Sequence, residues 1–454
     1  MRRWFLALIL ATLPGLATAT IHVPADYPTI QAAINASAGD SIIVAPGTYV
    51  ENLKALSSVL LVSEAGPAAT IIDGSNPSNP DSASVIFAPG GIRLHGFTIT
   101  GGTGTTRGVG GDVKAGGGLY LGGTSTISGN WITENHVPFI GGGIGVFSQN
   151  FGTHNIIGNR IYSNSAGING GAVLISVTAP LSLTLQENFI YDNHALNGTG
   201  GATHNPGGDH GLHLRNVYAC NSSGNPNNGN GAIWGCYEIR SCTFVSNEGA
   251  NAAVDPRFGK THNSIFAFNV GGGLHCASFA TSTCNDFFMN TPFDVQGGCA
   301  VIGQNGNIAV DPAFGDGGSC GASYCLSPGS PLLPENSPPG CGLIGAVGAC
   351  EVLAIDDLTS PDFASGPLLA RPNPLNPQTT LSFLLAASRH VELGIFDAQG
   401  RLVRNLTSET MPRGRHDVTW DGRDEAGREV ASGAYIAVLK SPAARLTQKL
   451  LVLK

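Results

Sequence analysis

A short motif that recurs every 21 to 29 residues constrains the fold of this chain more than any other feature. Its clearest copies are NWITEN (130–135), NRIYSN (159–164) and NFIYDN (188–193), and looser copies begin at Asn216, Cys242, Asn263 and Asn285. Glycine-rich turns that open apolar strands follow the first two copies 11 residues later, at Gly141 and Gly170. The distance between the two motifs stays the same from one copy to the next, which indicates a structural repeat.

A repeat of this length with two or three short strands cannot bury an apolar face alone, so its units stack into a solenoid. We expect Ile132, Ile161 and Ile190 to point inward and to stack about 4.8 Å apart. The Asn that closes each copy suits a tight corner, because Asn tolerates the left-handed conformation. A leucine-rich repeat would need a leucine lattice, and a propeller would need a longer repeat of four strands. The pattern therefore predicts an all-β parallel β-helix.

A solenoid also needs a cap, because its first coil exposes an unpaired strand edge. Residues 27–38 (YPTIQAAINASA) place Ile30, Ala33 and Ile34 on one face of a short helix, with Gly39 as a stop signal. We expect this helix to cap the N-terminal end and strands to follow at 41–45 and 59–63.

Both ends of this region resemble a known family. HVPADYPTIQAAI (22–34) and APGTY (45–49) resemble the opening of pectin-lyase-like right-handed β-helix proteins. Asn307, DPAF (311–314) and SPGSP (327–331) are similar to their closing coils. The resemblance implies a right-handed parallel β-helix over residues 20–352. It does not imply one activity, because the group mixes lyases, hydrolases, epimerases and non-enzymatic surface proteins.

The first residues read as an export signal. Arg2 and Arg3 precede an apolar run at 4–13 and small residues at 17–19, so we expect a signal peptide at 1–19. The run is shorter than the roughly 20 residues of a membrane span. We therefore expect a secreted or outer-surface protein with no membrane span in the mature chain.

Charge is distributed unevenly and limits the partners. Residues 368–454 hold 12 Lys and Arg against 8 Asp and Glu, whereas the rest of the chain has a net charge of −12. An acidic body repels phosphate backbones, so nucleic acid is not expected as a partner. An acidic polysaccharide would require calcium to bridge it to carboxylates; otherwise no cofactor is expected.

All ten cysteines lie between Cys220 and Cys350. Behind an export signal, disulfides are the expected state. Zinc is the competing interpretation, but no CxxC pair occurs and the His residues lack finger spacing. Spacing does not define connectivity; the pairs that close short local loops, Cys284 with Cys299 and Cys341 with Cys350, are our expectation.

The pattern changes beyond a linker at 353–367. Residues 368–454 contain six alternating segments with turn signals between them, which predicts an independent Ig-like β-sandwich with Trp420 in its core. The expected strands are 379–385, 390–396, 402–406, 416–420, 434–439 and 446–453.

This second domain also resembles a family. FDAQGRLV (396–403), WDG (420–422) and SGAY (432–435) are similar to the Ig-like domain of the flagellar hook-cap protein and to type IX secretion sorting domains. The resemblance implies an attachment or sorting domain that engages secretion machinery. A passive spacer or binding module is the alternative.

Stacking of the repeats predicts a candidate active site. Glu134, Ser163 and Asp192 should form one row, and His136, Ser165 and His194 another. Glu134 and Asp192, two coils apart, would be separated by about 9.6 Å. That is near the upper end of the range of about 6.5–9.5 Å in inverting glycosidases. The further candidates, on the stretch 198–215, are Asp209, His210 and Arg215.

Other observations weigh against catalysis. Asp209, His210 and Gly211 are similar to a fragment of polygalacturonase motifs, but the adjacent Asp pair of those enzymes is missing nearby, and the Arg and Lys set of the lyases is not recognisable. A non-catalytic adhesion, structural or glycan-binding role is therefore favoured. A carbohydrate-active enzyme, either a polysaccharide hydrolase or a lyase, is the alternative. The aromatic residues available for glycan binding are Trp131, Tyr162, Tyr191 and Trp234.

Overall fold

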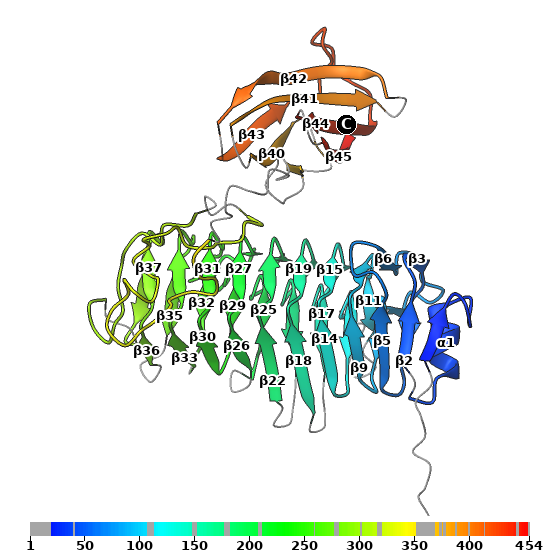
Figure 1. Ribbon diagram of the computed structural model, residues 1–454, viewed down its shortest axis with the longest axis horizontal. Helices are drawn as coiled ribbons and strands as arrows, with labels where there is room; N and C mark the ends of the chain where they lie inside the picture. Colours follow the sequence, from blue (N-terminus) through cyan, green and yellow to red (C-terminus); the bar gives the residue numbers. More distant parts are fainter. Residues whose placement is uncertain are drawn as a thin grey trace, which may run out of the picture.

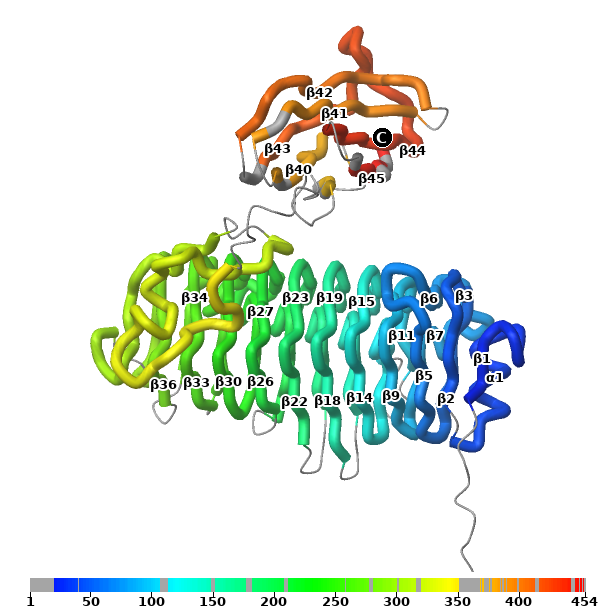
Figure 2. The backbone as a smooth tube through the Cα atoms, viewed as in Figure 1, coloured from blue at the N-terminus to red at the C-terminus, as the bar shows by residue number. Residues whose placement is uncertain are grey.

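The computed structural model describes residues 20–350 and 368–452, except for 40, 107–112, 148–151, 177–181, 208–210, 258, 277–280, 300–301, 316–319, 372–374, 376–377, 386–387, 398–399, 413 and 442–444. In the first part, successive turns of the chain stack along one axis, with their strands side by side (Figures 1 and 2). Three long sheets, A, B and C, run along this axis and their strands pair in parallel. The predicted parallel β-helix is confirmed. The expected signal peptide (1–19) and linker (353–367) lie outside the described residues.

Sheet A consists of β1 (Thr20–Val23), β2 (Ser41–Val44), β5 (Val59–Ser63), β9 (Ile92–His95), β14 (Ser125–Ser128), β18 (Thr153–Ile157), β22 (Ser182–Gln186), β26 (Leu212–Leu214), β30 (Glu238–Arg240), β33 (Lys260–His262) and β36 (Ser282–Thr283). Sheet B consists of β3 (Gly47–Val50), β6 (Thr70–Asp73), β10 (Thr98–Thr100), β15 (Trp131–Thr133), β19 (Arg160–Tyr162), β23 (Phe189–Tyr191), β27 (Val217–Ala219), β31 (Thr243–Val245), β34 (Ile265–Ala267) and β37 (Asp286–Phe288). Sheet C consists of β4 (Leu53–Lys54), β8 (Ile86–Ala88), β13 (Leu119–Leu121), β17 (Ile144–Val146), β21 (Val173–Ile175), β25 (Thr203–His204), β29 (Ile233–Trp234), β32 (Val254–Asp255), β35 (Leu274–Cys276) and β38 (Val295–Gly297).

Two smaller sheets complete the solenoid. The short parallel sheet, which follows sheet B in four consecutive coils, consists of β16 (His136–Val137), β20 (Ser165–Ala166), β24 (His194–Ala195) and β28 (Ser222–Ser223). An antiparallel sheet consists of β7 (Ser82–Ala83), β11 (Gly104–Thr106) and β12 (Lys114–Ala115).

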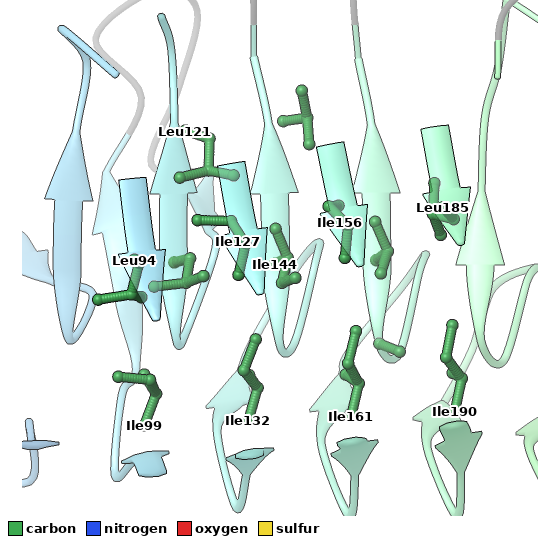
Figure 3. Packing of buried hydrophobic residues seen from close by; sticks show 14 of the residues in the cluster. Leu94, Ile99, Leu121, Ile127, Ile132, Ile144, Ile156, Ile161, Leu185 and Ile190 are labelled. Carbon is green, nitrogen blue, oxygen red and sulfur yellow. The ribbon is translucent and has the colours of Figure 1, made fainter. Parts of the chain in front are cut away.

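The centre of the β-helix is filled by columns of like side chains. Ile132, Ile161 and Ile190 are partners in the register of sheet B and are fully buried, as expected. Figure 3 shows them in a row with Ile99. The later coils continue this column with stacked aromatic rings whose centroids lie 4.9–5.1 Å apart, from Tyr218 through Phe244 and Phe266 to Phe287. Like residues repeat because each strand meets its counterpart at the inter-strand spacing.

A buried ladder of asparagines follows sheet B from coil to coil. Each Asn donates from Nδ2 to Oδ1 of the next at 2.8–3.0 Å, through Asn135, Asn164, Asn193, Asn221, Asn247, Asn269 and Asn290. The left-handed conformation, however, belongs to the residue before each Asn, for example Ser163 with φ 54°. We expected the Asn itself to adopt it, and that was wrong. The Asn instead uses its amide to bind backbone carbonyl groups inside the solenoid, as Asn193 does with Ile161.

A short helix covers the first coil. α1 (Ile30–Ala36) buries Ile30 and Ala33, and the Thr29 hydroxyl accepts from Ala32 N–H at its N-cap. The Glu51 carboxylate accepts from the N–H groups of Ile30 and Gln31, both at 2.9 Å. The helix is shorter than the expected 27–38, because these acceptors fix its beginning after Pro28.

The coils end earlier than the sequence suggests. After β38, residues 308–315 and 320–350, which we call the strap, lie across the outer face of sheet B in the later coils (yellow across green in Figure 2). Tyr324, Leu326, Leu332 and Ile344 of the strap form a second apolar core with outward side chains of sheet B, including Val245. The strap thus covers an apolar outer face that a solenoid leaves exposed.

Four disulfides hold this end of the molecule. Two tie the strap to the coils, Cys220–Cys320 and Cys284–Cys341; Cys276–Cys299 joins the last coils, and Cys325–Cys350 lies within the strap. The four cysteines we expected to be bonded are all bonded, but our pairing of Cys284 with Cys299 and Cys341 with Cys350 was wrong. Sequence proximity misled us because the strap folds back over earlier coils.

The C-terminal domain is a two-sheet antiparallel sandwich. One sheet contains β39 (Leu369–Arg371), β40 (Thr379–Leu385) and β43 (Gly414–Trp420), and the other β41 (Arg389–Asp397), β42 (Leu402–Met411), β44 (Gly433–Lys440) and β45 (Arg445–Val452). The expected Ig-like sandwich is confirmed, and each expected strand is present. Trp420 is fully buried in the core and its Nε1 donates to the carbonyl of Arg423 at 2.9 Å.

Candidate functional site

Two of the candidate residues, Glu134 and Asp192, occupy the same place in different coils. Each directly follows a strand of sheet B, and their left-handed backbones have φ of 53° and 57°. Ser163 has the same conformation in the coil between them. The register of β15, β19 and β23 puts the three residues in one row along the axis. Glu134 is exposed, Ser163 is half-buried and Asp192 is buried, so the exposure of the row decreases along the axis.

A second row runs beside the first on the short sheet. His136, Ser165, His194 and Ser222 are successive partners in its parallel register. Nδ1 of His136 lies 2.8 Å from Oγ of Ser165, and Nδ1 of His194 lies 2.7 Å from Oγ of Ser222. The row therefore consists of imidazole–hydroxyl pairs that bridge neighbouring coils.

Asp192 connects the two rows. Its Oδ2 accepts from Oγ of Ser163 at 3.0 Å, and its Oδ1 lies 3.3 Å from Nε2 of His194. The Asp192 side chain is 10% exposed, whereas that of His194 is 35% exposed. One carboxylate oxygen of Asp192 thus accepts a hydrogen bond from Ser163, and the other lies within ion-pair distance of the His194 ring. This arrangement suits a group that orients an imidazole better than one that protonates a glycosidic oxygen.

The other candidates do not join this cluster. Arg215 follows a strand of sheet A, at the opposite end of sheet B from Asp192, and pairs there with Glu187. Both side chains of that ion pair are close to half exposed. Asp209 and His210 lie outside the described residues. The structure therefore brings Asp192 and His194 together, with Glu134 in the same row, and separates them from Arg215.

Burial sets the protonation state of several groups near the rows. It lowers the pKa of His136, an effect that Glu134 opposes and His194 reinforces. Burial also raises the pKa of Tyr162 and of Tyr191. At neutral pH, His136 is therefore a neutral imidazole and the two phenols keep their hydroxyl protons.

Aromatic and basic side chains extend outward from sheet B beside the first row. Tyr162 and Tyr191 stack with ring centroids 4.9 Å apart, and the Arg160 guanidinium lies 5.8 Å from the Trp131 ring centroid. The three aromatic rings are half-buried and Arg160 is exposed. Because Tyr162 and Tyr191 stack along the axis, one face of each ring is covered by the other.

Trp234 lies elsewhere, on sheet C. Its ring is stacked on His204, with centroids 4.5 Å apart, and the Arg257 guanidinium lies 4.7 Å from it. Burial, together with Arg257, lowers the pKa of His204 to about 4. Because His204 and Arg257 pack against the Trp234 ring, this ring is not part of the aromatic group on sheet B.

The sequence reasoning missed Ser222 and the strap. Ser222 belongs to a looser copy of the repeat, but the spacing from Asn193 to Asn221 would have placed it beside His194. No such signal existed for the strap, because its contacts join residues far apart in the chain. Among the described residues, no group of three or more His, Cys, Asp or Glu side chains is arranged to hold a metal ion.

The FlgD Ig-like domain family matches residues 377–443, within the sandwich. This agrees with the expected resemblance to the flagellar hook-cap domain. No curated protein matches the chain. Among the described residues, no helix has the length and apolar character needed to cross a membrane.

Two solved structures are similar to parts of the chain. One is PorZ, described as a surface component of the type-IX secretion system of Porphyromonas gingivalis, at 25% identity and a TM-score of 0.16 over 19% of this chain. The match spans only 11% of PorZ. The other is pectin methylesterase from carrot, at 14% identity and a TM-score of 0.25, covering 67% of this chain and 91% of the enzyme.

Proposed function

We propose that this chain is an extracellular surface protein that binds a glycan on the open part of the outer face of sheet B. The observation that carries the proposal is a patch on the outer face of sheet B, in which Trp131 and Arg160 share one row and Tyr162 lies in the adjacent row. The strap leaves this patch uncovered, and it lies beside the row of Glu134 and Asp192. Four disulfides are typical of a chain that folds in an oxidising environment outside the cytoplasm.

The chemistry of this surface suits a sugar chain. Half-buried aromatic rings offer apolar contact, while the phenol hydroxyl of Tyr162 and the guanidinium of Arg160 offer hydrogen bonds to sugar hydroxyls. Trp131 lies on one coil and Arg160 and Tyr162 lie on the next, about 4.8 Å further along the axis. A polymer that lies along the axis can therefore contact these groups from successive coils.

Hydrolysis by a pair of carboxylates is supported less well. Such a mechanism needs one carboxyl group as proton donor and the other as base or nucleophile, on opposite sides of the bond. Asp192 is held by Ser163 and His194, and Glu134 lies two coils away in the same row. We therefore assign Glu134 and Asp192 to binding and to the positioning of neighbouring groups.

The C-terminal domain is proposed to attach or deliver the β-helix to the cell surface. Its net charge of +4 contrasts with −12 for the rest of the chain, and it has its own core around Trp420. Deletion of residues 368–454 should leave the β-helix folded but retained inside the cell envelope. Unchanged surface delivery of the truncated protein would contradict the sorting role.

The glycan proposal is tested by binding of the mature chain to an array of extracellular polysaccharides. Trp131→Ala and Tyr162→Ala should each weaken binding by about tenfold or more, the loss that a central aromatic contact produces. The matched control is Tyr237→Ala, because Tyr237 is exposed but lies before β30 of sheet A. Equal binding by all four proteins, or binding by none, would contradict the proposal.

A further inference from the structure

We propose that Ser222, His194 and Asp192 form a serine-type acyl-transfer site that hydrolyses carboxylic esters. Nδ1 of His194 lies 2.7 Å from Oγ of Ser222, and Nε2 of His194 lies 3.3 Å from Oδ1 of Asp192. This is the order of nucleophile, base and orienting carboxylate that defines a catalytic triad by geometry, whatever the fold. The inference goes beyond glycan binding and does not depend on it.

Stacking alone explains the contact with serine but not the contact with aspartate. Three other imidazole–hydroxyl pairs bridge neighbouring coils, namely His95–Ser128 at 3.1 Å, His136–Ser165 at 2.8 Å and His262–Thr283 at 2.7 Å. Within the described residues, His194 is the member of this set whose second ring nitrogen lies within 4.0 Å of a carboxylate. That contact singles out one pair among four.

The carboxylate decides which nitrogen of His194 carries the proton. Oδ1 of Asp192 lies 3.3 Å from Nε2 of His194, so the negative charge of the carboxylate favours the tautomer with N–H at Nε2. The Nδ1 lone pair then faces Oγ of Ser222 and can take its proton. Asp192 is itself fixed by Ser163 and by burial, so it acts as a positioning residue for the imidazole.

The site is accessible from solvent. The His194 side chain is 35% exposed and Ser222 is half-buried at the surface of the short sheet. The nearby Cys220–Cys320 disulfide fixes the strap two residues before Ser222. An ester on a flexible or extended molecule can therefore approach Oγ from outside the solenoid.

The reaction balances with water as the only co-reactant. Oγ of Ser222 attacks the ester carbonyl carbon while its proton passes to Nδ1 of His194. The C–O bond to the alcohol then breaks, and the alcohol leaves with that proton. Water, deprotonated by the same Nδ1, attacks the acyl-serine, and the proton returns to Oγ as the carboxylic acid departs.

Backbone geometry limits the rate of this site. The N–H groups of Ser222, Ser223 and Gly224 all donate within the sheet, to Asn193, Glu248 and Ala195 at 2.8–2.9 Å. They are therefore not available to a tetrahedral oxyanion, and the loss of one such donor costs about 10²–10³-fold in rate. We expect slow turnover, so covalent labelling is the most sensitive measurement.

The test treats the mature chain with a fluorophosphonate probe, follows hydrolysis of p-nitrophenyl acetate, and maps the labelled residue by mass spectrometry. Label should appear on Ser222 and both signals should vanish in Ser222→Ala. Asp192→Asn should slow labelling by about 10²-fold or more and change its pH profile, because the imidazole tautomer is no longer fixed. Ser128→Ala, from the pair without a carboxylate, should label like the wild type.

Three outcomes would overturn the inference. They are absence of label on the wild type, equal labelling of Ser222→Ala, and labelling of Asp192→Asn with an unchanged rate and pH profile. Circular dichroism of each variant separates loss of chemistry from loss of fold. The glycan array is measured on the same proteins, so failure of ester hydrolysis and failure of glycan binding are distinguished.

Discussion

The two halves of the outer face of sheet B differ, although the inner faces of both halves are columns of buried apolar side chains. In the earlier coils the outward side chains include Trp131 and Tyr162, which are half-buried, and Arg160, which is exposed. In the later coils they are apolar, for example Val245 and Ile265, and the strap buries them to 1% exposure or less. The inner columns must repeat because each side chain packs on its counterpart. The outer columns are free of that constraint, so one half can bind a ligand while the other binds the strap.

The largest expected effect tests the shared inner face. Ile161→Asp places a charge in a fully buried column and should destabilise the solenoid by several kcal/mol, enough to prevent folding. Arg160→Ala, which changes the neighbouring outward side chain, should leave the fold intact. Thermal unfolding followed by circular dichroism checks both, and a stable Ile161→Asp protein would contradict the register.

A smaller effect is expected where the strap is held. The double substitution Cys220→Ser and Cys320→Ser removes one strap disulfide, a crosslink between residues that are 100 positions apart in the chain. It should cost about 2–5 kcal/mol of unfolding free energy. The apolar outer half would then become accessible to a hydrophobic dye, whereas the open half would not change. Urea unfolding with unaltered midpoint and no added dye binding would show that the strap is held by other contacts.

The strap contact should also depend on pH. Burial raises the pKa of Asp286 from 3.8 to about 8, although Val310 N–H donates to its Oδ1 and opposes this shift. The folded state binds the proton of Asp286 more tightly than the unfolded state does, so protonation of Asp286 stabilises the fold. This stabilisation is fully present below pH 3.8 and is lost as pH rises to about 8. Asp286→Asn should remove this decline, measured as urea midpoints between pH 5 and 9. If the urea midpoints of the wild type and of Asp286→Asn change with pH in the same way, Asp286 is not the cause of the pH dependence.

The smallest effect is expected at Arg215. Its ion pair with Glu187 is close to half exposed on both sides, and such pairs contribute about 0–1 kcal/mol. Arg215→Ala should therefore change stability little and should leave both glycan binding and ester hydrolysis unchanged. A strong loss of glycan binding or of ester hydrolysis would show that Arg215 contributes to the candidate site.

The parts of the fold that repeat could be predicted from sequence, and the parts that do not repeat could not. The spacing of the asparagines was sufficient to place Ile132, Ile161 and Ile190 inside and to align Glu134 with Asp192. It could not reveal the strap, because no repeat links Cys320 to Cys220. Turn signals and alternation similarly predicted the sandwich strands, since those depend on local chemistry.

The candidate site was predicted in part for the same reason. Asp192 and His194 were placed correctly because their rows follow the register, and Ser222 lies one coil further in the same row. Their mutual contacts depend on side-chain torsions that the register does not define. Arg215 was grouped with them by nearness in sequence, but a strand of sheet B separates the two corners.

The division of sheet B into a bound half and an open half depends on the strap lying across its outer face. The direct test is to map the disulfides of the unreduced protein by mass spectrometry of its proteolytic peptides. The structure requires Cys220 bonded to Cys320 and Cys284 bonded to Cys341, with Cys236 and Cys242 as free thiols. Bonds between Cys284 and Cys299 and between Cys341 and Cys350 would instead mean that the strap forms its own local loops. That result would leave the later half of sheet B uncovered and contradict the division between a bound half and an open half.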